Sequence, residues 1–270
     1  MGFQREIGEI LEHFKLLDPR TIELPPVYGD LGTVSVDIQA PDAHSLLSEL
    51  IYNKFHARTR EVVADTTKVD IVRFLRSHSM FQKAQSGAGY EKPFPRLSFD
   101  RSPGFAHVFG RQGWSDQITG VGRVYITAPG AVARTNLFIK VLESFESFAY
   151  PLQAKMSWNP SALRSDDIVL YFDASHGFSE GCDLASFVLN EVVDPHFRGA
   201  KSVFTKTLTS CASIATEVRT PRNEGMSFGI ERSAICADLV LAILRGKGDE
   251  IQSIAEGWGI DLSALFPGVN

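Results

Sequence analysis

Apolar residues recur every three or four positions in seven segments of the chain, which is the spacing of an amphipathic helix. The predicted helices cover residues 3–17, 42–55, 69–85, 131–148, 181–193, 227–246 and 249–258. Pro19 limits the first helix, and Gly246 follows the last apolar position of the sixth. Helices are therefore expected from the first residues of the chain to near its end.

A second pattern, in which apolar and polar residues alternate, predicts strands at residues 122–127 and 152–158. Residues 167–172 contain the run IVLYF, as in a strand that is buried on both faces. Three shorter strands are expected at residues 96–99, 105–109 and 203–208. These elements predict an α+β fold in one domain over residues 1–270, with a mostly antiparallel or mixed sheet and packed helices.

Two regions lie outside this regular pattern. Residues 1–40 form the N-terminal helix and an extension from it, and residues 86–122 are rich in glycine and carry few periodic positions. Glycines, aromatic residues and arginines cluster in the second region, which favours a loop that covers a substrate. A plain surface excursion is the alternative interpretation.

The polar sides of the two alternating strands carry the first candidate chemistry. Arg123 and Tyr125 alternate with apolar residues in 122–127, and Lys155 does so in 152–158. If both strands lie in one sheet with these sides aligned, a guanidinium, a phenol and an amine share one surface. A solvated sheet face with ordinary charged residues is the alternative.

The start of the helix near residue 227 carries the second candidate. Ser227 is a favourable N-cap residue, and Gly229 in the first turn costs about 1 kcal/mol relative to Ala. The close approach of another group to the backbone is one reason to keep a glycine there. A helix N-terminus offers free N–H groups to phosphate, and Arg232 can add a bidentate contact. The alternative is a capped helix with a surface arginine.

Composition narrows the class of protein. The net charge of −5 argues against general binding to DNA or RNA. Cys182, Cys211 and Cys236 are too few and too widely spaced for a disulfide framework or a zinc site, so buried thiols in a reducing compartment are expected. The N-terminus has no signal-peptide pattern, and no apolar run approaches the ~20 residues of a membrane span. We therefore expect a cytoplasmic protein that binds neither nucleic acid nor membrane.

Motifs for known cofactors are missing from the sequence. It has no phosphate-binding P-loop, no dinucleotide-binding glycine pattern, no nucleophile elbow and no H-E-x-x-H zinc motif. The seven histidines are scattered, and none makes a metal-binding pair at positions i and i+4. The sequence therefore predicts neither a metal nor an organic cofactor.

Several short segments, in this order, resemble the HopA-type family of type III secretion effectors, which includes the lyase partners of class V lanthipeptide and thioamitide biosynthesis. They are LIYNKFH at 50–56, RVYI at 123–126, the strand of Lys155, LRSDDIVLY at 163–171, FTKTL at 204–208, and SFG at 227–229 followed by Arg232. The resemblance spans roughly residues 45–240. The family often has an aromatic residue where this chain has His56.

The resemblance implies a lyase that eliminates phosphate from phosphothreonine or phosphoserine in a precursor peptide, giving dehydrobutyrine or dehydroalanine. The middle segment is also distantly similar to the phosphothreonine lyase effectors, which places Lys155 near their base. Tyr125 falls near their proton donor, which is a His in those proteins. The implied phosphate ligands are Arg123, Arg164, Lys206 and Arg232, and the implied peptide contacts are His56 and Tyr171. A separate kinase that phosphorylates the peptide is the implied partner.

The chemistry of β-elimination explains why such residues are needed. A base removes the Cα proton while phosphate departs from Cβ, and a lysine base must be neutral although its ordinary pKa is about 10.4. Neighbouring arginines disfavour the protonated amine and can hold the phosphate. Two alternatives remain: a non-catalytic effector or scaffold that binds a peptide or protein partner, and a phosphatase or phosphate-dependent transferase that uses the same anion site.

Overall fold

The structure is a computed structural model, and it describes residues 15–18, 21–23, 35–82, 95–111, 120–173, 178–218 and 226–259. The chain divides into two compact units. The first unit combines residues 1–60, 202–206 and 220–270, and the second combines residues 61–201 and 207–219. Each unit is described by itself. The expectation of a single domain stays a prediction, and so does the substrate loop at 86–122, much of which lies outside the described residues.

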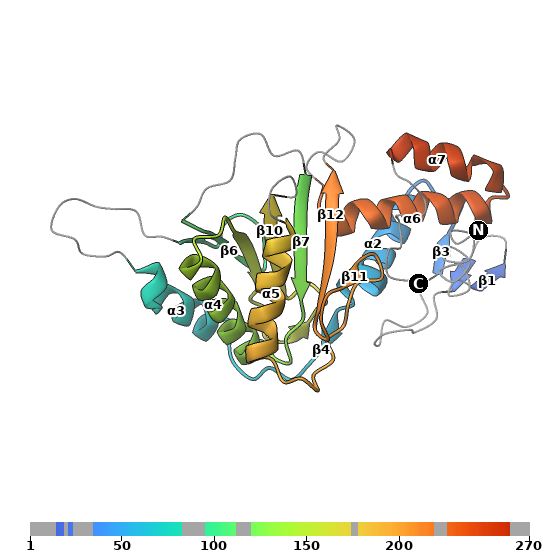
Figure 1. Cartoon of the computed structure of the whole chain (residues 1–270). Coiled ribbons are helices and arrows are strands. Elements are labelled where there is room, and N and C mark those ends of the chain that lie inside the picture. The colour runs from blue at the N-terminus through green and yellow to red at the C-terminus, as the bar shows by residue number, and fades with distance from the viewer. Residues whose placement is uncertain are drawn as a thin grey trace. The chain divides into compact units, whose positions relative to one another are not determined.

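The second unit is built on a sheet whose strand order is β11-β12-β7-β10-β8-β6-β5 (Figure 1). Its strands are β5 (Arg96–Ser98), β6 (Phe105–Phe109), β7 (Gly120–Ile126), β8 (Gln153–Ser157), β10 (Ile168–Asp173), β11 (Lys206–Thr207) and β12 (Ala212–Val218). The pairs from β12 through β5 are antiparallel. The α+β class with a mostly antiparallel sheet is therefore confirmed.

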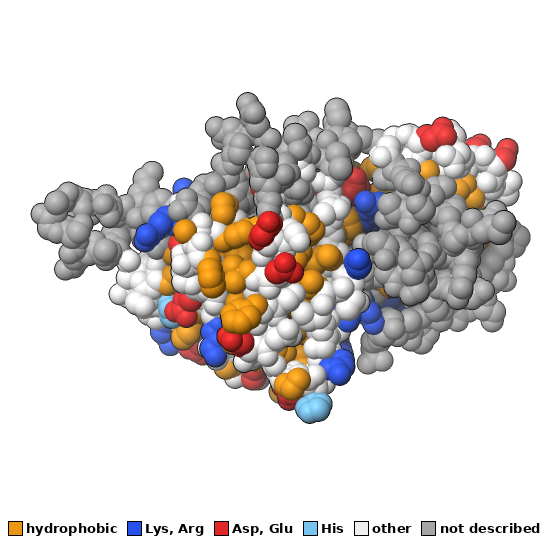
Figure 2. Space-filling view, viewed as in Figure 1, with side chains coloured by type: hydrophobic (Ala, Val, Ile, Leu, Met, Phe, Trp, Pro, Cys, Tyr) orange, Lys and Arg blue, Asp and Glu red, His pale blue; other side chains and the backbone are white. Residues whose placement is uncertain are grey.

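Helices cover one face of this sheet, and the core of the unit lies between them and the strands. The helices are α3 (Lys68–Ser77), α4 (Ala131–Ser147) and α5 (Phe178–Val192), with a 3-10 turn at Ser79–Phe81. Val124 of β7 and Leu170 of β10 are fully buried against Phe138 and Leu142 of α4. Figure 2 shows apolar side chains on the outward face of α4 and α5 as well.

The first unit is mainly helical in its described part. It contains α2 (Ala43–Ile51), a π-helix at Tyr52–Ala57, α6 (Phe228–Leu244), a 3-10 turn at Gly248–Glu250 and α7 (Ile251–Trp258). Its strands β1 (Lys15–Asp18), β2 (Thr21–Glu23) and β3 (Ser35–Asp37) form a small antiparallel sheet. Buried residues of α2 and α6 pack these two helices together. Two very short strands remain, β4 (Arg60–Glu61) and β9 (Ala162–Leu163).

Most predicted elements are confirmed, and three differ. The helix predicted at 3–17 is wrong at its end, because Lys15–Asp18 is a strand; residues 3–14 lie outside the described part. The helix predicted to reach residue 85 ends at Ser77, because His78 takes an extended backbone conformation. The strand predicted at 203–208 is shorter in the structure, where it consists of β11 alone. Strand β12 was not predicted, because its small residues Ala212, Ser213 and Ala215 give a weak apolar alternation.

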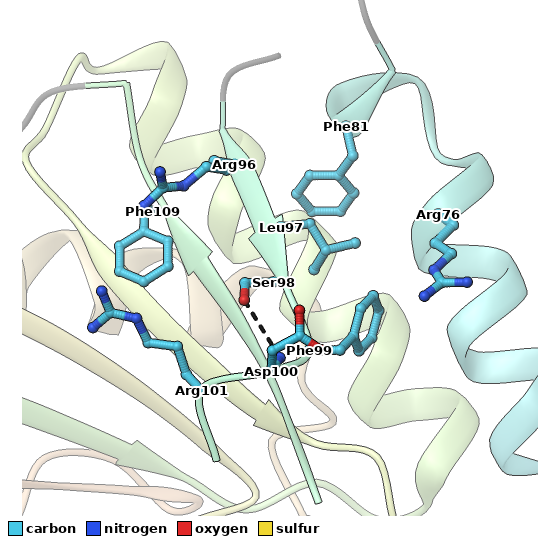
Figure 3. Close-up of a pocket in the computed structure, with 9 residues that line it drawn as sticks. All are labelled: Arg76, Phe81, Arg96, Leu97, Ser98, Phe99, Asp100, Arg101 and Phe109. Carbon is cyan, nitrogen blue, oxygen red and sulfur yellow. Dashed lines mark hydrogen bonds between the residues drawn. The ribbon is translucent and has the colours of Figure 1, made fainter. Parts of the chain in front are cut away.

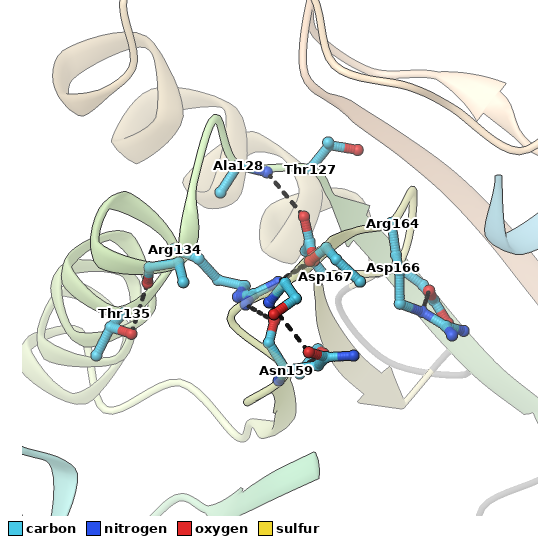
Figure 4. A network of polar contacts seen from close by, with 12 residues as sticks. Thr127, Ala128, Arg134, Thr135, Asn159, Arg164, Asp166 and Asp167 are labelled. Carbon is cyan, nitrogen blue, oxygen red and sulfur yellow. Dashed lines mark hydrogen bonds and ion pairs between the residues drawn. The ribbon is translucent and has the colours of Figure 1, made fainter. Parts of the chain in front are cut away.

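A buried ion pair joins α4 to the connection that enters β10 (Figure 4). The guanidinium of Arg134 donates to the carboxylate of Asp167, and neither side chain has any exposed surface. Arg134 also donates to the backbone carbonyls of Asn159 and Ala162. The Asp167 carboxylate accepts from the backbone N–H of Ala128 at 3.4 Å. Through these bonds the Arg134 side chain fixes the segment from Asn159 to Asp167, which contains Arg164 and Asp166.

We expect Asp167→Asn to lower the free energy of unfolding by about 3–5 kcal/mol, because it leaves a buried guanidinium without its counter-charge. Denaturant unfolding followed by circular dichroism measures the change. The matched control is Lys247→Ala, which breaks the exposed Lys247–Glu250 pair and is expected to change stability by less than about 1 kcal/mol. Equal losses in the two variants would contradict the structural role of the Arg134–Asp167 pair.

Candidate functional site

The register of four strands lines up a row of side chains on the sheet face opposite the helices. Val169 of β10 lies opposite Tyr125 of β7 on one side and opposite Lys155 of β8 on the other. Lys155 in turn lies opposite His107 of β6. Directly paired residues project from the same face, so Tyr125, Val169, Lys155 and His107 form one row. Tyr125 and Lys155 are two strand spacings apart, or about 10 Å between Cα atoms.

A second row lies beside the first. Arg123 of β7 is paired with Tyr171 of β10, which is paired with Gln153 of β8. The Arg123 guanidinium carbon lies 5.4 Å from the centre of the Tyr171 ring. The sequence-based expectation of aligned polar faces therefore agrees with this register, although β10 separates the strands of Arg123 and Lys155.

Lys155 and Arg164 share the ring of Phe105. The Lys155 Nζ atom lies 4.4 Å from the ring centre, and the Arg164 guanidinium carbon lies 5.8 Å from it. Arg164 follows the short strand β9 and donates from Nε and Nη2 to the two carboxylate oxygens of Asp166, at 2.7 and 3.1 Å. Asp166 is buried at the start of β10. A carboxylate fixed by the sheet thus holds the guanidinium in a defined plane beside the amine.

His107 was not predicted as a site residue. Its Nε2 atom lies 2.7 Å from the Ser102 hydroxyl oxygen, within hydrogen-bonding distance. Burial, together with the positive charges of Lys155 and Arg101, lowers the pKa of His107 to about 4. The imidazole is therefore neutral at neutral pH. The alternation in FAHVF predicted its strand, but the pairing of that strand with the strand of Lys155 cannot be read from the sequence.

Arg123 and Tyr125 belong to a buried polar layer. The Arg123 guanidinium forms an ion pair with the Glu217 carboxylate of β12, and both side chains are nearly buried. Burial raises the pKa of Tyr125 well above its ordinary value, while the neighbouring Arg123 opposes that rise. The pKa of Tyr171 is raised in the same way, again by burial. Both phenols are therefore protonated at neutral pH and can act as donors.

Three other predicted residues belong to the first unit by contact clustering. His56 lies in the π-helix, where its Nδ1 atom is 2.9 Å from the Ser202 hydroxyl oxygen. The Arg232 guanidinium carbon lies 5.2 Å from the Phe228 ring, and its Nε and Nη1 atoms are buried without a hydrogen-bond partner among the described residues. Lys206 is exposed and is the first residue of β11, whose second residue, Thr207, belongs to the second unit. Their roles in binding phosphate or peptide stay predictions.

The glycine in the first turn of α6 has a direct structural reason. A Cβ atom placed on Gly229 would lie 2.1 Å from Cδ2 of the His56 ring. That ring is stacked against Phe204 and tilted against Phe228, with ring centres 6.3 and 6.1 Å away. Because Gly229 has no side chain, the imidazole can pack directly against the helix backbone. This agrees with the sequence-based interpretation that another group approaches the backbone closely there.

Other site chemistry was searched for in the described residues. Cys182, Cys211 and Cys236 are free and buried, as expected. No group of three or more His, Cys, Asp and Glu side chains in the described ranges is arranged to hold a metal ion. Of the helices described, none is both long and apolar enough to cross a membrane.

A family model identifies the class of protein to which this chain belongs, a family of effector proteins. Residues 98–264 match the family model described as the HopA1 effector protein family. This match covers more than half of the chain, so the protein belongs to that family. No curated protein matches the sequence significantly.

Solved structures resemble the chain at low sequence identity. An effector protein from Pseudomonas syringae pv. tomato strain DC3000 is 12% identical, with a TM-score of 0.56 over 98% of this chain and 95% of that one. An effector from Pseudomonas syringae pv. syringae strain 61 is 13% identical, with a TM-score of 0.46 over 84% and 80% of the two chains. The type III effector and phosphothreonine lyase OspF from Shigella flexneri is 13% identical, with a TM-score of 0.36 over 72% and 98%. At 12% identity, the likeness to the effector of strain DC3000 shows a shared fold and does not show a shared activity.

We expect Gly229→Ala to lower the free energy of unfolding by about 1–3 kcal/mol, because the new methyl group overlaps the His56 ring. Denaturant titration measures this loss. Gly248→Ala is the matched control, since nothing lies within 4 Å of a Cβ atom there. In the double variant Gly229→Ala/His56→Ala the two losses should be clearly less than additive. Additive losses would show that the ring and the glycine do not interact.

Proposed function

We propose that this protein is a lyase that eliminates phosphate from phosphothreonine or phosphoserine in a peptide. The observation that carries the proposal is the placement of Lys155 and Arg164 on one aromatic ring, on a sheet face that also presents Tyr125 and His107. At that spacing the amine can reach the Cα proton of a phosphorylated residue while the guanidinium binds its phosphate. The family membership supports the proposal without specifying the reaction.

In this mechanism Lys155 Nζ, as the neutral amine, takes the proton from Cα of the phosphorylated residue. The electron pair of that C–H bond forms the Cα–Cβ double bond, and the Cβ–O bond breaks to release phosphate. The products are a dehydrobutyrine or dehydroalanine residue and inorganic phosphate, so no oxidant, metal or water is consumed. A proton returned to the departing oxygen stabilises it.

Arg164 is the proposed phosphate ligand that shares the Phe105 ring with the base. Its Nε and Nη2 atoms donate to Asp166, so a bound phosphate shares the guanidinium with this carboxylate. Arg123 contributes a second positive charge one row away, partly balanced by Glu217. Lys206 and Arg232 stay predicted phosphate ligands on the strength of the sequence resemblance.

Tyr125 is the proposed proton donor, and Tyr171 a proposed peptide contact together with His56. Because burial holds the pKa of Tyr125 above its ordinary value, its hydroxyl carries a proton at neutral pH. Its row also contains the base, which places donor and acceptor on one surface. We propose that the substrate is a precursor peptide of the lanthipeptide type, phosphorylated beforehand by a separate kinase.

A non-catalytic role in binding a peptide or protein is the second candidate. The observation that favours it is the pairing of both arginines of this face with carboxylates, Arg123 with Glu217 and Arg164 with Asp166. Such pairs also occur in purely structural polar layers. The two candidates differ in what they require of Lys155, because only the lyase needs an amine that can lose its proton.

We expect wild-type protein to convert a peptide with one phosphothreonine into a product lighter by one phosphoric acid. Lys155→Arg keeps the charge but cannot deprotonate at neutral pH, so its rate should fall by about 100-fold or more. Lys140→Ala, an exposed change on α4, is the control and should retain the full rate. Mass spectrometry follows the product, and circular dichroism checks that each variant is folded.

Two results would contradict the lyase. The first is a product in which threonine replaces phosphothreonine, which means hydrolysis. The second is an unreduced elimination rate in Lys155→Arg. Phosphothreonine and phosphoserine peptides that both remain unchanged with folded wild-type protein would favour the binding role.

A further inference from the structure

A pocket of about 540 Å³ surrounds the outer strand of the sheet in the second unit (Figure 3). It is lined by residues 96–101 together with Arg76, Phe81 and Phe109. Strand β5 is the last in the sheet order, and among the described strands β6 is its one partner. An exposed strand edge is a template onto which another extended chain can add, through backbone hydrogen bonds.

Arginines flank this edge on both sides. Arg96 and Arg101 lie over the Phe109 ring, each with its guanidinium carbon 4.8 Å from the ring centre. On the other side, Arg76 of α3 lies 5.2 Å from the centre of the Phe99 ring. Figure 3 shows Arg76 apart from the other two, across the strand. The aromatic faces hold Arg96 and Arg101 over β6, the inner neighbour of β5, and Arg76 beside Phe99, so the arginines line the pocket on both sides of β5.

The charge of the pocket selects an anionic partner. Its three arginines outnumber its single carboxylate, Asp100, and all four side chains are exposed. Leu97 and Phe81 add apolar surface on the side of α3. Successive side chains of an extended peptide point to opposite faces. A peptide added to β5 therefore meets arginines on both of its faces and apolar surface on one.

The pocket adjoins the candidate active site. Phe109 of the pocket and His107 of the polar row are two residues apart in β6, so they share a face. His107 lies directly opposite Lys155. A strand added outside β5 is three strand spacings from Lys155, or about 14 Å. An extended chain covers that distance in about four residues.

We propose that the outer edge of β5 binds an acidic stretch of the peptide substrate as an added strand, at least about four residues away from the phosphorylated residue. The identity of this peptide as the substrate rests on the proposed lyase function. The docking itself rests on the arginines of the pocket and on a strand that has a single partner strand in the described part of the chain. The site therefore selects peptides by a segment that does not react.

Binding is tested on the full chain with a fluorescein-labelled, unphosphorylated peptide of about eight residues in which pairs of Glu alternate with single Val residues, so that Glu side chains lie on both faces of the extended chain. Fluorescence anisotropy should show saturable binding that weakens about tenfold in Arg76→Gln/Arg96→Gln, which removes two charged contacts. Arg73→Gln is the matched control, because Arg73 is exposed on the same helix but does not line the pocket. It should bind like wild type.

The same peptide, N-methylated at every residue, separates strand addition from charge attraction. N-methylation removes backbone donors and leaves the Glu side chains intact, so binding should be lost. Equal binding of the N-methylated peptide would overturn the added strand. Equal binding by wild type and Arg76→Gln/Arg96→Gln would overturn the site.

Elimination is then compared for two phosphothreonine peptides, with and without the acidic stretch about five residues away. The stretch should lower KM about tenfold in wild type and not in Arg76→Gln/Arg96→Gln, with kcat unchanged. Equal KM values for the two peptides in wild type would overturn the proposal. If anisotropy shows the expected binding but neither peptide is eliminated, the docking edge stands and the lyase function is wrong.

Discussion

The packing of one apolar face of the sheet against α4 and α5 is the constraint on which the rest of the second unit depends. This face carries Val124, Ile126, Met156 and Leu170, and their burial fixes which residues of each strand point toward the helices. A shift of one strand by a single residue would place polar side chains among the apolar residues of this core. The row of Tyr125, Lys155 and His107 is therefore held in place by apolar packing on the other face of the sheet.

Paired charges organise the polar face itself. Each arginine has its own buried carboxylate: Glu217 of β12 for Arg123, and Asp166 of the turn before β10 for Arg164. Sequence-based reasoning expected arginines near Lys155 and did not consider their counter-charges. In the structure, both guanidinium groups are paired with carboxylates, which orient them before any anion binds. Such orientation reduces the conformational entropy lost on binding phosphate.

The sequence predicted these elements well where an apolar pattern repeats strongly. Alternation around Val124 and Met156 gave the right strands and the right polar sides, and the stripe after Ser227 gave α6 with its N-cap. The order of strands depends on pairings between distant segments, which local pattern does not contain. The pairing of His107 with Lys155 and of Glu217 with Arg123 was therefore not predicted. Nor could the sequence predict that β5 is the last strand of the sheet.

The same limit separates the two candidate functions. Arg123, Arg164 and Tyr171 suit a phosphate-binding surface whether or not chemistry follows, because a guanidinium oriented by a carboxylate serves both. Lys155 is different: a purely binding surface gains little by holding a primary amine over Phe105 beside Arg164, since a second guanidinium would bind phosphate with better geometry. An amine differs from a guanidinium in being able to lose its proton. Its presence at this one position in the row is therefore the feature that a lyase explains and a scaffold does not.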